Sequence, residues 1–132
     1  MGSDSPLVTV YIVNHNYGLY LLQAINSVLE QTLQNFELII IDNGSTDGSH
    51  SVIETFSQHN KILTIFQKNL GLSAANNIAM GRANGRYLIR LDADDFLDIH
   101  ALEVLSGILD RNQDIGLVFP DFYLTDADGN IL

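Results

Sequence analysis

Residues 87–96 read Tyr87-Leu88-Ile89-Arg90-Leu91-Asp92-Ala93-Asp94-Asp95-Phe96, a short apolar run that ends in three carboxylates within four residues. The run from 87 to 91 has the length and composition of a buried β-strand. Carboxylates packed this closely repel one another, so the cluster favours a hard divalent cation that offsets the repulsion. The acid-x-acid pair Asp92 and Asp94 at a strand end therefore predicts a site for a metal ion and a phosphate group.

Similar runs recur along the chain, and segments of helical periodicity separate them. We expect strands at 8–13, 37–42, 62–67, 87–91 and 117–119, and helices at about 21–29, 48–59, 72–83 and 101–109, the last with Asp98 as N-cap. The alternation predicts an α/β fold, an open and mostly parallel sheet with helices on both faces. In such sheets ligands bind beyond the carboxyl ends of the strands.

Composition limits the classes of function. The chain has 132 residues, 46% of them hydrophobic, which indicates one globular domain at 7–132, and residues 1–6 resemble an expression leader or a disordered start. A net charge of -10 opposes binding to nucleic acid or to an anionic membrane surface. No apolar run approaches the roughly 20 residues that span a bilayer, and there is no cysteine, so we expect a soluble, intracellular protein without disulfides.

Polar side chains follow three of the expected strands. The first strand is followed by Asn14, His15 and Asn16, the second by Asp42, and the fourth by the acid cluster. A carboxylate such as Asp42 can accept a hydrogen bond from the imino N–H of a uracil or thymine ring, and the ring of His15 or Tyr17 offers a face for stacking. A diphosphate near the two acid-cluster aspartates would need a bridging Mg²⁺ or Mn²⁺, because carboxylates alone repel it.

The ordered motifs resemble the N-terminal nucleotide-sugar-binding portion of family 2 glycosyltransferases, which have the Rossmann-like GT-A fold. The likeness runs from about residue 7 to the C-terminus. It rests on Ile12-Val13-Asn14-His15-Asn16-Tyr17, Ser27-Val28-Leu29-Glu30-Gln31-Thr32, Ile41-Asp42-Asn43-Gly44-Ser45-Thr46-Asp47-Gly48, Asn69-Leu70-Gly71-Leu72-Ser73-Ala74-Ala75-Asn76-Asn77 and Leu91-Asp92-Ala93-Asp94-Asp95.

This resemblance implies transfer of a sugar from a nucleotide-diphosphate donor, a UDP-sugar, to a hydroxyl of a saccharide or lipid-linked acceptor. It implies a metal-dependent (Mn²⁺ or Mg²⁺) displacement with inversion, in which Asp94 is the metal ligand. The general base is expected beyond Leu132, because the domain is expected to be truncated before the acceptor-binding segment. Polysaccharide biosynthesis in the cytoplasm is the expected setting, with a peripheral position at the inner face of the membrane as an alternative. The donor nucleotide contacts would be Asn14, His15, Asn16, Asp42, Asn69, Asp92 and Ala93.

Three departures from the family pattern carry information. His15 stands where a tyrosine is frequent, and Asn43 stands where a second aspartate is common, which suggests a role in turn geometry. Asn76 replaces a frequent arginine, so a cationic contact to the donor is missing. Four basic residues are candidates to replace that contact: Lys68, Arg82, Arg86 and Arg90.

Simpler explanations stay open for several of these residues. Asp42 would cap the turn after its strand, His15 and Tyr17 would belong to the core, and Asn69 would only shape a loop. A calcium loop is excluded because Phe96 stands where an oxygen ligand is needed. The alternative function is a nucleotide-sugar-binding module that lacks a general base and does not catalyse transfer. Residues 127–130, Ala-Asp-Gly-Asn, predict a hairpin turn.

Overall fold

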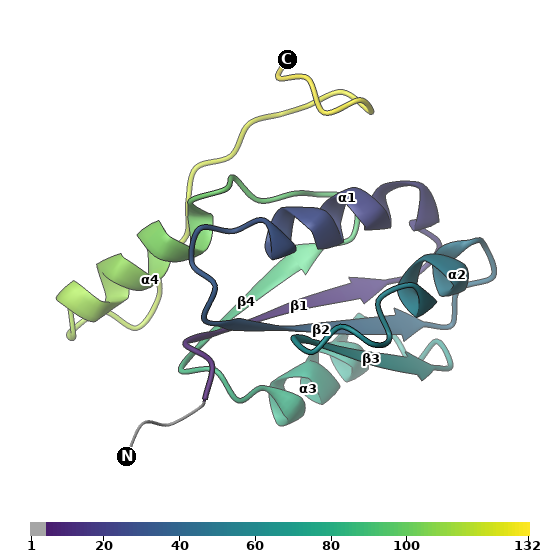
Figure 1. Cartoon of the computed structure of the whole chain (residues 1–132), viewed down its shortest axis with the longest axis horizontal. Helices are drawn as coiled ribbons and strands as arrows, with labels where there is room; N and C mark the ends of the chain where they lie inside the picture. The colour runs from purple at the N-terminus through teal and green to yellow at the C-terminus, as the bar shows by residue number, and fades with distance from the viewer. Residues whose placement is uncertain (1–4) are drawn as a thin grey trace.

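The computed structural model describes residues 5–132, so most of the expected leader at 1–6 lies outside the described residues. Four strands alternate with four helices (Figure 1). The elements are β1 (Val8–Asn14), α1 (Gly18–Leu29), β2 (Phe36–Asn43), α2 (Ser49–Glu54), β3 (Ile62–Gln67), α3 (Leu72–Arg82), β4 (Tyr87–Asp92) and α4 (Ala101–Arg111).

All strands of the sheet are parallel, in the order β3-β2-β1-β4. The chain therefore moves outward in one direction from β1 through β2 to β3, and then returns to place β4 on the other side of β1. The register pairs Asn14 with Asp42 and Val13 with Asp92, so the ends of β1, β2 and β4 lie at one level. This reversal of strand order is the place where open α/β sheets bind ligands.

Helices cover both faces of the sheet, as the sequence predicts (Figure 1). On one face α1 buries residues at positions i, i+3, i+4 and i+7, namely Leu21, Ala24, Ile25 and Val28, together with residues of α2 and α4. On the other face α3 packs through Ala75 and Ala79 onto Tyr11. Each fully buried aliphatic side chain of this kind contributes about 1.5–3 kcal/mol to folding. This two-sided burial explains why β1 and β2 read as nearly continuous apolar runs.

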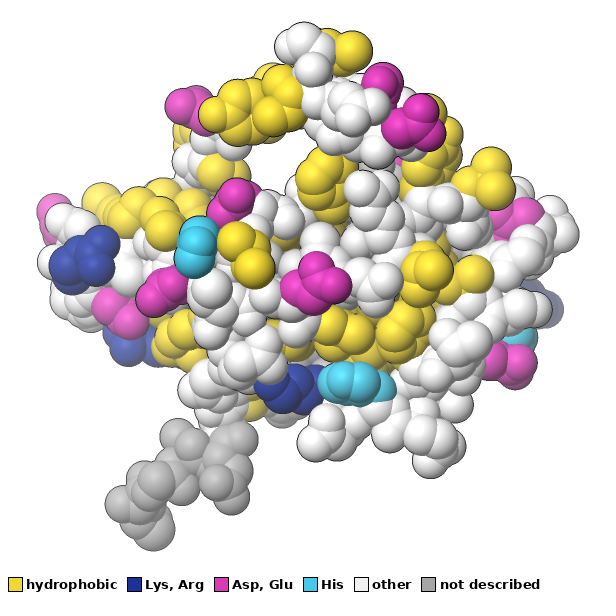
Figure 2. Space-filling view, turned by 45° about the horizontal axis from the view of Figure 1, so that its top comes forward, with side chains coloured by type: hydrophobic (Ala, Val, Ile, Leu, Met, Phe, Trp, Pro, Cys, Tyr) yellow, Lys and Arg dark blue, Asp and Glu magenta, His cyan; other side chains and the backbone are white. Residues whose placement is uncertain are grey.

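The expected strand at 117–119 is wrong. Gly116 and Val118 line a groove beside β4 and α4, but the segment forms no ladder with β4. Leu117 and Phe119 are 77% and 80% exposed, so little apolar burial offsets the entropy lost in ordering them. Figure 2 shows this C-terminal segment arching away from the body, with hydrophobic side chains gathered along it.

Two further expectations from the sequence concern the start of α4 and the turn near the C-terminus. The N-cap of α4 is His100 and not Asp98, because Asp98 instead forms an Asx turn with its Oδ1 accepting the His100 N–H at 2.9 Å. The expected hairpin turn is confirmed, with Gly129 at φ +85° and a bridge between Thr125 and Ile131.

None of the helices within residues 5–132 has the length and hydrophobicity to cross a membrane.

Candidate functional site

The buried pair Asn14 and Asp42 forms the centre of the carboxyl edge. Asn14 Nδ2 donates to Asp42 Oδ1 and to Ser45 Oγ, both at 3.0 Å, and the Ser45 N–H donates to Asp42 Oδ2 at 3.0 Å. Asp42 therefore does cap the turn after β2, and each of its oxygens keeps acceptor capacity for a further donor. Asn14 Oδ1 is buried and has no hydrogen-bond partner in the described part of the chain. A buried polar atom without a partner is uncommon in folded proteins, so this oxygen stays available to a further donor.

Asn16 joins the loop after β1 to the loop after β2. Its Oδ1 accepts the Thr46 N–H at 2.7 Å, and its own N–H donates to Ser45 Oγ at 3.0 Å. Asn16 has φ +62°, a conformation that asparagine tolerates better than most residues. These bonds give Asn16 a loop-shaping role, whereas a direct contact to a nucleotide stays a prediction.

His15 and Tyr17 are both exposed, so the interpretation of these two residues as core residues is wrong. His15 Nδ1 lies 3.0 Å from the backbone oxygen of Asn43. Because a carbonyl oxygen can only accept, Nδ1 carries the proton and Nε2 faces away from this bond. The ring is thus anchored at one nitrogen while its faces and its second nitrogen stay available to a ligand.

Asn69 lies in the loop between β3 and α3. Its Oδ1 accepts the Asn43 side-chain amide at 3.2 Å and the Gly71 N–H at 3.1 Å. Gln67, the last residue of β3, donates to Asn43 Oδ1 at 3.0 Å. Gln67 was not predicted from the sequence, although it shares with Asp42 the position of a polar residue at the carboxyl end of a strand.

The residues of the acid cluster, 92–95, differ in their surroundings. Asp92 is ion-paired with Arg90, whose Nη2 lies 3.0 Å from Oδ1, and both side chains are partly exposed. Ala93 is buried in the main core. Asp94 is exposed and has no hydrogen bond or ion pair among residues 5–132. Burial, followed by the charges of Asp94 and Asp92, raises the pKa of Asp95.

No group of three His, Asp or Glu side chains within the described chain is arranged to hold a metal ion by itself. The free carboxylate of Asp94 nevertheless suits Mg²⁺ or Mn²⁺. Mg²⁺ typically binds one or two carboxylates and takes its remaining ligands from phosphate oxygens and water. The residues present therefore fit a cation that arrives with a diphosphate, and they do not form an all-protein metal cage.

Of the four basic residues considered as replacements for the missing arginine, Arg90 is the one in contact with the acid cluster. Arg86 precedes β4 at its opposite end and pairs with Asp110 at 3.3 Å. Arg82 occupies the last turn of α3, and Lys68 follows β3, separated from β4 by β2 and β1. Arg90 is thus the candidate that touches the acid cluster, and its contact to a donor stays a prediction.

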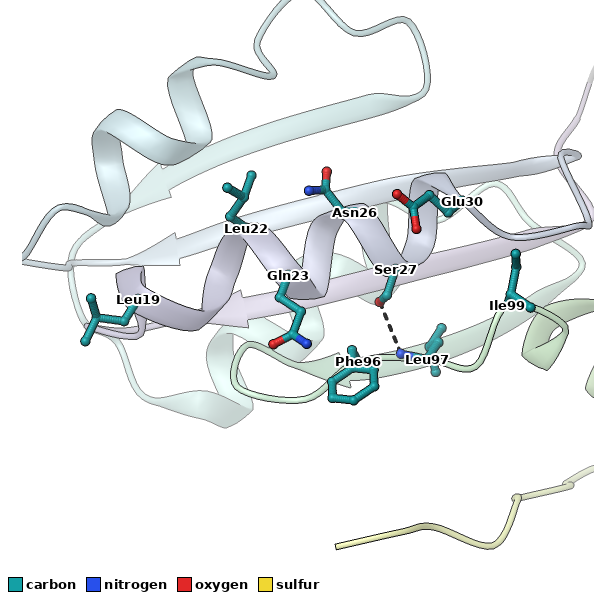
Figure 3. Close-up of a pocket in the computed structure, with 9 residues that line it drawn as sticks. All are labelled: Leu19, Leu22, Gln23, Asn26, Ser27, Glu30, Phe96, Leu97 and Ile99. Carbon is teal, nitrogen blue, oxygen red and sulfur yellow. Dashed lines mark hydrogen bonds between the residues drawn. The ribbon is translucent and has the colours of Figure 1, made fainter. Parts of the chain in front are cut away.

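Apart from the groove beside β4 and α4, a hollow lies between α1 and the segment after β4 (Figure 3). Gln23 and Ser27 project from α1 toward Phe96 and Leu97, and the Leu97 N–H donates to Ser27 Oγ at 3.1 Å. None of the site residues predicted from the sequence lines this groove. The candidate site is therefore the carboxyl edge of the sheet and not the hollow beside α1.

Two solved structures share the fold. Staphylococcus aureus TarS 1–349 in complex with UDP superposes with a TM-score of 0.73 at 21% identity, over 80% of this chain and 32% of that chain. A mannosyltransferase from Pyrobaculum calidifontis in complex with GDP-Man and Mn²⁺ gives 0.70 at 22% identity, over 83% of this chain and 33% of that protein.

Relatives found by sequence have a higher identity to this chain than these two structures do. Chondroitin synthase of Escherichia coli is 33% identical over 128 residues, which are 96% of this chain and 19% of that enzyme. Glycosyltransferase GlyG of Streptococcus pneumoniae is 34% identical over 129 residues, 96% of this chain and 42% of GlyG. The chain thus spans less than half the length of these two relatives. The family model described as Glycosyl transferase family 2 matches residues 9–129, and the chain belongs to this family.

Proposed function

We propose that this chain forms the nucleotide-sugar-binding part of a glycosyltransferase that transfers a sugar from a UDP-sugar to an acceptor hydroxyl. The observation that carries the proposal is the position of Asn14, Asp42 and Asp92 at one level of the sheet, at the reversal of strand order. The neighbour complexes with UDP and with GDP-Man and Mn²⁺ support it. The acceptor would be a saccharide or a lipid-linked saccharide.

The proposed roles follow from the surroundings of each residue. Asp42 is held by Asn14 and Ser45 and can accept the imino N–H of the base with a remaining lone pair. The anchored ring of His15 would stack on the base, and Asp92 would contact the donor beside it. Asp94 would ligate the cation, which when bound supplies the positive charge that balances the diphosphate. Rigid placement of the base and the diphosphate orients the bond that breaks.

In the proposed reaction the acceptor oxygen forms a bond to the anomeric carbon while the bond to the diphosphate oxygen breaks, which inverts the configuration. A general base takes the acceptor proton. Proton transfer of this kind contributes about 10²–10⁴-fold to the rate. The proposal assigns donor binding to this chain and names none of its residues as the base.

Calorimetric titration of UDP with Mn²⁺, with Mg²⁺ and with EDTA tests the proposal. We expect binding that depends on the cation and that falls at least about tenfold in Asp94→Ala, because its carboxylate is the free ligand of the cluster. Asp114→Ala is the matched control, since Asp114 is exposed beyond the end of α4. Absence of binding for UDP, GDP and dTDP alike, or equal affinities of the Asp94 and Asp114 variants, would contradict the proposal.

A further inference from the structure

Asn43, the last residue of β2, is bonded to two other segments at the carboxyl edge, residue 15 after β1 and residues 67–70 at the end of β3. Its side chain is 4% exposed. Asn43 Oδ1 accepts from Gln67 Nε2 at 3.0 Å and from the Leu70 N–H at 3.2 Å, while Asn43 Nδ2 donates to Asn69 Oδ1 at 3.2 Å. Its backbone oxygen is the partner of His15. One residue therefore links the ends of β1, β2 and β3.

The direction of these hydrogen bonds is fixed at both ends by backbone groups. The Leu70 N–H can only donate, so it requires the oxygen of Asn43 at that place. The Gly71 N–H can also only donate, so it requires the oxygen of Asn69, which leaves Asn43 as the donor to that oxygen. Position 43 must therefore accept and donate at once, which an amide does and an ionised carboxylate does not.

The loop after β3 also lies directly against the end of β2. Gly44 has φ +78°, and a Cβ placed there would lie 2.7 Å from the backbone nitrogen of Asn69. Only a residue without a side chain permits this approach. The Asn43 and Asn69 amides thus join two loops that are already in close contact, and this contact holds the two amides in a defined orientation.

From this geometry we infer that Asn43 is a positioning residue of the donor site. Its amide holds the loop 68–71, and its carbonyl holds His15, in the arrangement that receives the nucleotide. The inference rests on the proposed function, because it assigns Asn43 a role at the same edge. It differs from the turn-geometry role expected from the sequence, since the bonds of the Asn43 side chain reach β3 and the loop after it, outside its own turn.

The variant Asn43→Asp tests the requirement for a donor. When ionised, its carboxylate faces Asn69 Oδ1, so two acceptors meet; when protonated, its O–H restores the donor in nearly the same shape. The titratable group that contacts position 43 is His15, and wild type measured at each pH controls for its titration. We expect UDP affinity, with Mg²⁺ present, about tenfold below wild type at pH 8 and within about twofold of it at pH 5.

Two further variants separate the hydrogen bonds from the added charge. Asn43→Ala removes the donor without adding charge, so it is expected to weaken UDP binding at both pH values. Asn60→Asp, at an exposed position, adds the same charge elsewhere and is expected to bind as wild type does at both pH values. Wild-type affinity in Asn43→Ala, or wild-type affinity of Asn43→Asp at pH 8, would overturn the inference.

Amide hydrogen exchange in the nucleotide-free protein gives a readout that does not depend on the proposed function. The Leu70 and Gly71 amides are expected to lose protection in Asn43→Ala at both pH values, and in Asn43→Asp at pH 8 and not at pH 5. Unchanged protection would overturn the amide linkage itself. If protection changes as expected while wild type binds no nucleotide, the proposed function is wrong, and the role of Asn43 in donor binding is wrong with it.

Discussion

Gly44 illustrates how one residue sets the spacing of the loops at the site. Its φ of +78° and the 2.7 Å approach to Asn69 leave no room for a side chain. We expect Gly44→Ala to lower the free energy of unfolding by about 1–3 kcal/mol, because a left-handed backbone is strained in alanine and the Asn69 backbone must move. Urea denaturation measures the change.

Gly48→Ala is the matched control for this substitution. Gly48 lies in the same loop, has φ −73°, and has no atom within 4 Å of a Cβ placed there. Its substitution is expected to change stability by less than about 0.5 kcal/mol. Equal losses in the two variants would mean that the close approach of the loops does not determine stability.

At the scale of elements, Glu37 of β2 ties the sheet to the loop that leads into β4. It accepts hydrogen bonds from Thr9 Oγ1 at 2.6 Å and from the Asn84 N–H at 2.6 Å. Burial by itself would raise the pKa of Glu37, but the hydrogen bonds from Thr9 and Asn84 outweigh it and lower the pKa. The carboxylate therefore stabilises the fold above the unfolded-state pKa of about 4.3, and this stabilisation is lost as the pH falls through the lower folded value.

The predicted consequence is a stability difference between wild type and Glu37→Gln that depends on pH. The variant should be less stable at pH 7, and the difference should shrink as the pH falls below about 4, where the wild-type carboxyl becomes protonated. Urea midpoints between pH 7 and pH 2.5 measure this. Glu30→Gln serves as control, since Glu30 is exposed in the groove beside α1. A difference that stays constant over this range would contradict the role of the charge.

The strands and crossover helices were predictable because each depends on a local pattern. The apolar runs of β1, β2, β3 and β4 were located to within one residue at either end. The segment at 117–119 has the same local pattern, but a strand also needs a paired edge, which the pattern does not encode. Gln31 shows the same limit, because two of its side-chain hydrogen bonds, to Asp98 and Leu102, connect elements far apart in the chain.

The site was predictable to a similar degree. That polar residues after β1, β2 and β4 meet at one edge follows from parallel strands, and the structure brings Asn14 and Asp42 into contact. The partners of Asn43 were not predictable, because they depend on how closely the loop after β3 approaches β2. The pairing of Arg90 with Asp92 was within reach, since residues i and i+2 of a strand share a face.

At the scale of the whole molecule, the central claim is that a nucleotide diphosphate binds across the ends of β1, β2 and β4. The most direct measurement is a map of backbone amide chemical-shift changes as UDP and Mg²⁺ are added. We predict the largest changes at residues 14–16, 42–45, 69–71 and 92–95, with the amides of the groove around Gln23 and Phe96 unchanged. Changes confined to that groove, or none at saturating UDP, would contradict the account.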